Sequence, residues 1–296
     1  MTTRDAVLDE ATWRERRAAH EARVEAWVRP HLERREARVP HPVEDFLFTY
    51  YSQRPAALRR WHPGYGVVLE GGWSTYAGLK GYVERPGGHA TVAWEHVAGQ
   101  RPLLTALHTL LSATASRPAQ LGCFGLHEWA MVYRLDQSDV RHASWPLRLG
   151  PRGTDEVVEG HRVACSHFDA FRFFTDDARP LNALRPGRDD RPAFEQPGCL
   201  HAGMDLYKHA YRLSPLVDSD LVADCFDLAR DIRVLDMRAS PYDLADLGFE
   251  PIPIETAAGK ASYAEAQRGF AERGSPLRAR LVAECERLLP VLAQTT

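Results

Sequence analysis

The 296-residue chain lacks the features that mark a membrane or secreted protein. No run of residues approaches the roughly 18 uninterrupted apolar positions that a membrane-spanning helix requires. Residues 1–5 are not followed by the apolar segment that a secretory signal contains. We therefore expect a cytoplasmic protein with no membrane partner. The hydrophobic fraction of 44% is ordinary for a globular chain and supports a sizeable core.

Cysteine is scarce and widely spaced. No CxxC pair occurs, which excludes a zinc ribbon and a thioredoxin motif. We predict that all five cysteines are buried free thiols. They are Cys123, Cys165, Cys199, Cys225 and Cys285.

Lysine is rarer still. Lys80, Lys208 and Lys260 stand against 34 arginines, and the formal net charge is −3. A strong nucleic-acid binder usually has a clear excess of positive charge, which this chain lacks. A local basic patch stays open, and residues 8–38 with residues 54–60 are the best candidates for it.

Several familiar signatures are also missing. The chain has no GxGxxG after a strand, no GxxxxGK[ST] phosphate loop, and no HExxH, GxSxG or EF-hand sequence. The H-x-E…P-C-x-x-C pattern of zinc deaminases does not occur either. These absences argue against the common cofactor-dependent and hydrolase classes.

Helical periodicity dominates what is present. We predict an α+β fold that is predominantly α-helical with a small antiparallel β element. Residues 1–40 are expected to form an N-terminal charged helix, and residues 41–296 a single α-rich domain. The β elements are expected near residues 64–100 and 157–174. The predicted helices cover residues 8–38, 43–52, 54–61, 102–115, 126–134, 200–213, 219–237, 260–273 and 276–293.

Two helix-compatible segments, residues 123–134 and 196–209, carry ionisable side chains among apolar ones. Such groups are costly to bury unless they are paired, and functional sites are a common reason for them. Polar groups on two apolar helices are best satisfied by facing each other. We therefore expect His127, His201 and Asp205 to border one cavity.

The second of these segments offers acid–base chemistry. His201 and Asp205 are four residues apart and share a helix face, with Lys208 close to that face. A carboxylate in an apolar setting has a raised pKa and serves as an acid or a base. The alternative is an internal ion pair of Asp205 with Lys208 or His209.

The first segment and two others add candidates. His127 and Glu128 are adjacent and point about 100° apart on a helix, so one faces the cavity and the other meets a backbone or arginine partner. His167 and Asp169 have the spacing of one strand face, which suits metal ligands, a carboxylate-oriented imidazole or a rim hydrogen-bond network. In the charged segment 230–243, Asp236 is placed to reach a pocket and Arg238 accompanies it.

Four segments of the chain are distinctive: HPVEDFLFTYY (41–51), LHEWAMVY (126–133), QPGCLHAGMDLYK (196–208) and LDMRASPYDL (235–244). Together they resemble a family of actinobacterial proteins labelled 3-methyladenine DNA glycosylase. The resemblance runs from about residue 40 to residue 270, and no Leu-Pro-Gly-Val-Gly hairpin of the helix-hairpin-helix glycosylases is present. No catalytic residue is therefore carried over by motif.

The resemblance implies an N-glycosidase that releases a modified nucleobase from a nucleoside or from DNA. Such an enzyme needs a carboxylate near the sugar and an aromatic clamp for the base. Asp205 or Asp236 would supply the carboxylate, and the near-neutral charge favours the smaller substrate. The aromatic candidates are Trp129, Tyr133, Tyr50, Tyr51 and Tyr207, and the phosphate contacts would come from Arg54, Arg59, Arg60 and the N-terminal helix.

The expected site uses no cofactor. Its catalytic candidates are Asp205, His201, Glu128 and Lys208. Its substrate-binding candidates are His127, Trp129, Tyr133, Tyr207, His167, Asp169, Asp236, Arg238 and Tyr51. Two alternatives stay open. One is a metalloenzyme that holds Fe, Zn or Mn through His127, His167, His201 and Asp205; the other is a non-catalytic protein that binds a small ligand or nucleic acid.

Overall fold

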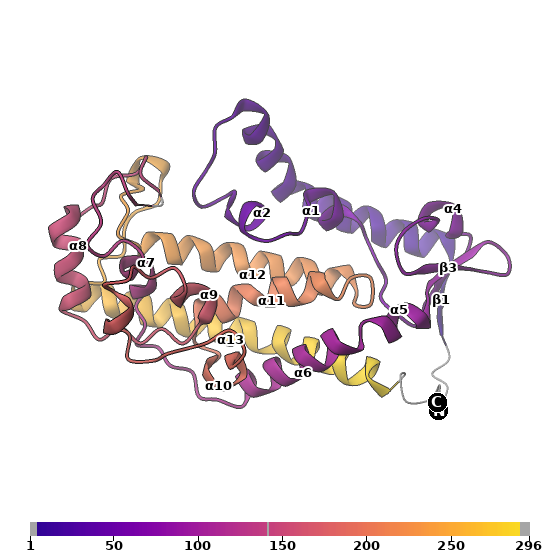
Figure 1. The fold of residues 1–296 in the computed structure, drawn as a ribbon. Coiled ribbons are helices and arrows are strands. Elements are labelled where there is room, and N and C mark those ends of the chain that lie inside the picture. The colour runs from indigo at the N-terminus through magenta and orange to yellow at the C-terminus, as the bar shows by residue number, and fades with distance from the viewer. Residues whose placement is uncertain (1–4, 141, 291–296) are drawn as a thin grey trace. The chain divides into compact units, whose positions relative to one another are not determined.

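The computed structural model describes residues 5–140 and 142–290. It is mostly helical with a small four-stranded sheet, which confirms the predicted α+β class (Figure 1). The described residues fall into two compact units. The first comprises residues 5–108, 207–226 and 279–290, and the second comprises residues 109–206 and 227–278. No helix in these ranges combines the length and the apolar character that a bilayer crossing requires.

The first unit begins with the long charged helix that the sequence predicts. Helix α1 spans Glu10–Ala37, and the side chain of Asp9 caps its start by accepting a hydrogen bond from the Thr12 amide. Arg38 ends the helix in the left-handed conformation. Two short helices follow, α2 (Phe46–Tyr50) and α3 (Pro55–Arg59).

The sheet also belongs to the first unit, and its strand order is β1-β2-β4-β3. Strands β2 and β4 and strands β3 and β4 pair antiparallel, as predicted. Strand β1 pairs parallel with β2, so the four-stranded sheet as a whole is mixed. Three residues before a charged helix carry too short a pattern to reveal a strand. The strands are β1 (Ala6–Leu8), β2 (Val67–Leu69), β3 (Tyr82–Arg85) and β4 (His89–Val92). Helix α4 (Trp73–Tyr76) lies between β2 and β3 in the sequence, and helix α5 (Trp94–Gly99) follows β4.

Four long helices, α6, α11, α12 and α13, contribute residues to both units. The short elements α7 to α10 all belong to the second unit. The long helices are α6 (Arg101–Ala115), α11 (Leu200–Arg212), α12 (Ser219–Arg238) and α13 (Ala257–Leu288). The remaining elements are α7 (Leu126–Ala130), α8 (Gly150–Glu159), α9 (Phe168–Phe171) and α10 (Arg191–Phe194), with 3-10 turns η1 (Arg179–Leu181) and η2 (Ala245–Leu247).

The strand expected near residues 157–174 is wrong. Helix α8 covers the start of this range and helix α9 lies near its end. The extended stretch between them has a side chain as its partner. The backbone amide of Cys165 donates to the Asn182 side-chain oxygen (2.7 Å), and the Asn182 amide donates back to the Cys165 carbonyl (2.9 Å). This satisfies the backbone without a neighbouring strand.

The two helices predicted over residues 260–273 and 276–293 form one helix, α13, with Pro276 inside it. Residues 291–293 of that prediction lie outside the described residues. Proline favours a helix break, but packing overrides it here. Gly274, two residues before Pro276, is buried. A Cβ built on Gly274 would lie 3.6 Å from Leu206 and from Leu228.

A close approach of α11 and α12 within the second unit positions the site. A Cβ at Gly203 of α11 would lie 2.8 Å from Cδ1 of Ile232 on α12. Glycine at position 203 therefore leaves room for the Ile232 side chain between the two helices. His201 and Asp236, which flank this contact in sequence, are thereby brought into the same buried region.

Candidate functional site

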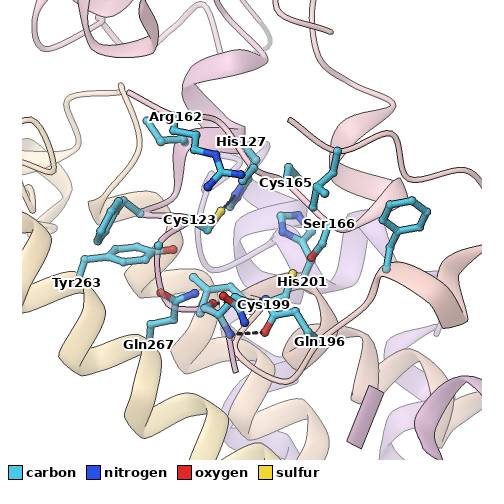
Figure 2. Close-up of a pocket in the computed structure, with 18 of the residues that line it drawn as sticks. Cys123, His127, Arg162, Cys165, Ser166, Gln196, Cys199, His201, Tyr263 and Gln267 are labelled. Atoms are coloured by element: carbon cyan, nitrogen blue, oxygen red, sulfur yellow. Dashed lines mark hydrogen bonds between the residues drawn. The ribbon is translucent and has the colours of Figure 1, made fainter. Parts of the chain in front are cut away.

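A cavity of about 540 Å³ lies within the second unit (Figure 2). None of the described residues that line it is an aspartate or a glutamate. Its polar lining consists mainly of thiols, imidazoles, guanidinium groups, amides and a phenol. These residues are Cys123, Cys165, Cys199, His127, His161, His201, Arg117, Arg162, Gln120, Gln196, Gln267, Ser166 and Tyr263.

The segment Gln196–Cys199 is fastened to one side of the cavity by a set of amide hydrogen bonds. The Gln196 side-chain oxygen accepts from the backbone amides of Gln120 (2.8 Å) and Gly198 (2.7 Å). Gln267 donates to the Gly198 carbonyl. A Cβ at Gly198 would lie 2.7 Å from the Gln120 carbonyl oxygen, so this position requires glycine. The segment therefore holds Cys199 and the start of α11 in a fixed place.

Cys123 stands on a tight turn at the entry to helix α7. Phe124 and Gly125 both have positive φ, at 47° and 70°. The Leu126 amide donates to the Cys123 carbonyl and closes the turn. The turn carries the Cys123 sulfur to 3.8 Å from Nδ1 of His127. A non-glycine residue with positive φ is uncommon, and such strain often accompanies a functional site.

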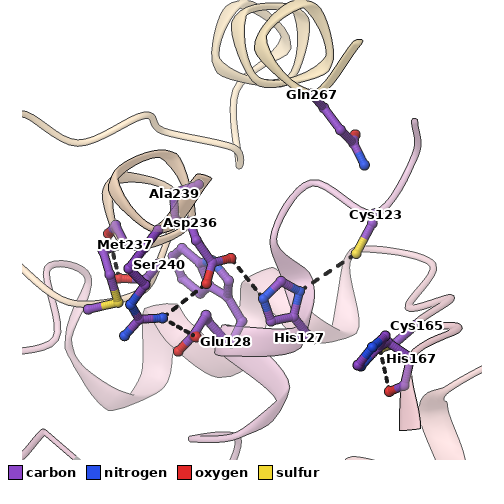
Figure 3. A network of polar contacts seen from close by, with 12 residues as sticks. Cys123, His127, Glu128, Cys165, His167, Asp236, Met237, Ala239, Ser240 and Gln267 are labelled. Atoms are coloured by element: carbon purple, nitrogen blue, oxygen red, sulfur yellow. Dashed lines mark hydrogen bonds and ion pairs between the residues drawn. The ribbon is translucent and has the colours of Figure 1, made fainter. Parts of the chain in front are cut away.

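The other nitrogen of His127 is held by a buried carboxylate. Nε2 of His127 lies 2.8 Å from Oδ1 of Asp236, and both side chains are buried. Figure 3 shows the resulting line of contacts from Cys123 through His127 to Asp236. Burial disfavours the imidazolium, but the charge and hydrogen bond of Asp236, together with Cys123, outweigh it and raise the pKa of His127 well above its usual value. Imidazolium is therefore the form that donates to both partners.

Asp236 is itself stabilised as an anion. Burial favours its neutral form, but the charge of His127 and its hydrogen bond, with Arg233 adding to them, hold the pKa of Asp236 below its usual range. Arg233 donates to Oδ2 of Asp236 (3.0 Å) and to Oε1 of Glu128 (3.1 Å). Burial raises the pKa of Glu128, while Arg233 works against that shift. Glu128 therefore meets an arginine partner, while its neighbour His127 faces the cavity.

One group of described residues has the spacing that a metal site requires: the possible ligand atoms of His127, Glu128 and Asp236 all lie within 4.8 Å of one another. The guanidinium of Arg233 already bonds to oxygens of both carboxylates. A metal ion placed there would face this buried cation at close range. The donor set therefore fits the ion-pair network better than a metal centre.

The four residues expected as metal ligands lie along a path rather than around one point. The rings of His127 and His201 are 4.5 Å apart, and those of His201 and His167 are 5.4 Å apart. Nε2 of His167 lies 3.4 Å from a carboxylate oxygen of Asp205. Burial, followed by the charge of His127, lowers the pKa of His201 to about 3, so this imidazole is neutral at physiological pH.

Asp205 does not border the cavity, so the expected grouping of His127, His201 and Asp205 is correct for the two histidines and wrong for the carboxylate. Arg191 reaches Asp205 at 2.8 Å and Glu195 at 2.5 Å. The buried carboxylate is thus engaged with an arginine from α10 that the sequence interpretation did not consider.

The remaining second-unit candidates have structural partners away from the cavity lining. Trp129 is fully buried and its indole donates to the Ala239 carbonyl. Tyr133 donates to Glu159, Arg238 donates to the Glu250 carbonyl, and Asp169 pairs with Arg172. His167 and Asp169 lie at the start of α9, not on a strand face as predicted.

Three candidates belong to the first unit. Tyr51 and Tyr207 are buried there, with their rings 5.6 Å apart in an edge-on contact. Lys208 follows Tyr207 on helix α11 and is partly buried. None of these three lines the second-unit cavity.

The three cavity thiols differ in their surroundings. Burial raises the pKa of the Cys165 and Cys199 thiols, which favours their neutral forms. Cys123 is partly exposed and contacts the imidazole of His127. All five cysteines are free, as predicted, but Cys123 and Cys199 are only partly buried.

The sequence predicts only a buried free thiol at Cys123 and gives no indication of Arg162 or Tyr263. The signal for Cys123 was its spacing of four residues from His127, which places both groups on one side of a helical turn. Arg162 and Tyr263 carried no comparable signal, because they come from distant segments that meet only in the folded unit. Comparisons with protein-family models, with curated protein sequences and with solved structures yield no match. They supply no family for the chain.

Proposed function

We propose that the protein is an enzyme that uses Cys123 as a nucleophile on a small molecule bound in the second-unit cavity. The observation that carries this proposal is the line Cys123–His127–Asp236, which begins at the cavity and ends in buried ion pairs. A thiol beside an imidazole that a third group orients is the arrangement that activates cysteine nucleophiles. The thiolate is the reactive form of a cysteine nucleophile, and the imidazolium of His127 lies beside the Cys123 sulfur.

The reaction class that suits this arrangement is acyl transfer. The Cys123 sulfur bonds to a carbonyl carbon, and the bond from that carbon to the leaving group breaks. His127 gives its proton to the leaving group, which leaves a thioester on Cys123. Water then attacks the thioester carbon and gives one proton to His127. The bond from that carbon to the sulfur breaks, the carboxylic acid departs, and the Cys123 thiolate and the His127 imidazolium are regenerated. Asp236 holds the ring orientation of His127 throughout.

Arg162 is placed to interact with the substrate. It is exposed at the cavity, and no acidic side chain in residues 5–140 or 142–290 pairs with it. Figure 2 labels it together with His127 and Cys123 among the residues that line the cavity. A guanidinium there would stabilise negative charge on a carboxylate substituent or on the oxygen of the attacked carbonyl.

The cavity gives less support to the N-glycosidase suggested by the resemblance. That chemistry needs a carboxylate facing the sugar, and the lining has none. Asp205 is engaged by Arg191, and Asp236 by His127 and Arg233. The N-glycosidase stays a prediction. Under it, Asp205→Asn should remove most of the base release from a methylated nucleoside, and near wild-type turnover of that variant would leave Asp236 as the second choice of carboxylate.

The proposal is tested with p-nitrophenyl acetate, which reports each acylation by releasing coloured p-nitrophenolate. We expect a burst equal to the enzyme concentration and an acetyl group on Cys123, located by peptide mass spectrometry. C123S should abolish the burst, and D236N should slow it at least tenfold because the imidazolium loses its buried anion. C199S is the matched control, since this thiol lines the same cavity, and it should keep the burst.

A second measurement separates chemistry from damage to the fold. Iodoacetamide should alkylate Cys123 of the folded wild type at least tenfold faster than Cys199, and H127Q should remove most of that difference. A full burst in C123S, or alkylation of Cys199 and Cys123 at equal rates, would contradict the proposal.

A further inference from the structure

A second cavity, of about 580 Å³, lies within the first unit. It is formed by the end of helix α1 and the segment that leads to helix α3. Its lining combines four guanidinium groups with aromatic and apolar walls. The lining includes Arg34, Arg35, Arg38, Arg54, Asp45 and Phe48.

The charges around this cavity do not balance. Asp45 is the one carboxylate among the described lining residues, and it is fully engaged. It accepts hydrogen bonds from His31 (2.9 Å), from Arg34 (2.7 and 3.0 Å) and from the backbone amide of His41 (2.8 Å). Burial favours its neutral form, but these donors outweigh burial and lower the pKa of Asp45. The carboxylate is therefore ionised and neutralised by Arg34.

Three guanidinium groups are left over. Within residues 5–140 and 142–290, no acidic side chain pairs with Arg35, Arg38 or Arg54. Arg35 and Arg38 come from the end of α1, and Arg54 comes from the residue before α3. Basic groups at a helix C-terminus complement its dipole, which is a structural reason for Arg35 and Arg38. It does not account for Arg54 at the start of another helix.

Arg38 is held at a conformational cost. It adopts φ 57° and ψ 35°, a left-handed geometry that glycine usually supplies at a helix end. Phe48 provides an apolar wall nearby, stacked on His31 with ring centroids 4.3 Å apart. A concave site with apolar walls and a few convergent charged groups is the usual form of a small-molecule site.

We infer that this cavity binds a small organic phosphate ester whose phosphate is held by Arg35, Arg38 and Arg54. Arginine is the residue best suited to phosphate, because its planar donors match the oxygens in pairs. The body of the ligand lies against the apolar wall that includes Phe48. The site is independent of Cys123, so it does not rest on the acyl-transfer proposal.

The test uses three probes with the full-length protein in calorimetric titrations. Phenyl phosphate carries both features, inorganic phosphate lacks the body, and benzyl alcohol lacks the charge. Phenyl phosphate should bind tightest, and benzyl alcohol should not bind. A 20-base-pair duplex is titrated in parallel, since a nucleic-acid backbone presents the same phosphate chemistry.

Two variants and one control make the result specific. R38G and R54Q should each weaken phenyl phosphate binding about tenfold, since each removes a charged hydrogen-bonding group. R38G suits this purpose because glycine adopts the left-handed geometry without strain. R16Q removes the same charge from an exposed position some 20 residues earlier on α1 and should change nothing.

Three outcomes would overturn the inference. The first is no binding of phenyl phosphate. The second is binding that R38G and R54Q leave unchanged. The third is duplex binding sensitive to both variants in the absence of phenyl phosphate binding, which would make the surface a nucleic-acid contact.

Discussion

At the scale of single residues, Arg233 decides what the buried centre of the second unit can be. It is 2% exposed and donates to both Glu128 and Asp236. Two carboxylates, one guanidinium and the imidazolium of His127 bring the formal charge of this group to zero. Buried charges are tolerated when they are paired in this way, and removing one partner exposes the cost of burying the rest.

We therefore predict that Arg233→Met destabilises the protein by about 3–5 kcal/mol, the usual cost of breaking a buried ion pair. The substitution leaves Glu128 and Asp236 facing each other with one cation fewer. Urea unfolding at pH 7 measures the change. Adding Glu128→Gln to the variant should recover part of the loss, because it removes one of the orphaned charges. A loss below about 1 kcal/mol would show that the network matters little.

The sequence indicated these residues only in part. Apolar neighbours marked His127, His201 and Asp205 as unusual, and the structure buries all three. The sequence could not show which carboxylate contacts which histidine or arginine. Asp236 and His127 are 109 residues apart in the chain, and their contact depends on how α7 and α12 pack. Arg191 and Arg233 looked like ordinary members of charged segments, yet they fix the roles of both aspartates.

At the scale of elements, helix α13 shows how local preference and packing compete. Glycine in a helix interior costs about 1 kcal/mol relative to alanine, so each glycine on α13 needs a reason. A Cβ at Gly259 would lie 2.0 Å from the Pro253 carbonyl oxygen. A Cβ at Gly269 would meet nothing within 4 Å. One glycine is required by a close backbone contact, and the other is not.

The two positions make a matched pair of predictions. Gly269→Ala should stabilise the protein by about 0.5–1 kcal/mol through helix propensity alone. Gly259→Ala should destabilise it by about 2–3 kcal/mol, because the new methyl group overlaps backbone that cannot rotate away. Chemical denaturation of both variants provides the comparison. Equal effects at the two sites would mean that the contact with residue 253 does not constrain the helix start.

Elements with strong periodicity were predictable, and elements set by tertiary partners were not. Helices α1, α6, α11 and α12 lie close to the ranges that their apolar spacing predicted. The stretch around Cys165 was misread as a strand because its alternation is real, but its partner is the Asn182 side chain. The proline in α13 was misread as a break because the packing that preserves the helix is not visible locally.

At the scale of the whole molecule, each unit buries a histidine in its neutral form. Burial, with the charge of Arg60 adding to it, lowers the pKa of His62 in the first unit to about 3. Burial and the charge of His127 do the same for His201 in the second unit. In the unfolded chain both titrate near pH 6.5. As the pH falls below that value, these histidines bind protons in the unfolded state but not in the folded state. The free energy of unfolding therefore decreases.

His127 acts in the opposite direction. Its pKa is raised in the folded state, so its contribution to stability is complete below about pH 6.5 and is lost as the pH rises through the folded pKa. Between pH 7 and pH 5 it therefore offsets part of the loss from the two neutral histidines, by about 1 kcal/mol. Asp236, whose pKa is lowered, loses its contribution only at more acidic pH.

We predict that the free energy of unfolding falls by about 2–3 kcal/mol between pH 7 and pH 5. His62 and His201 contribute about 2 kcal/mol each to this loss, against the gain at His127. Urea unfolding at several pH values gives the slope. His201→Gln, which cannot titrate, should reduce the loss by about 2 kcal/mol, and His62→Gln should do the same from the other unit. A stability that stays flat over this range, or a slope that neither substitution changes, would mean that these imidazoles take up protons in the folded protein.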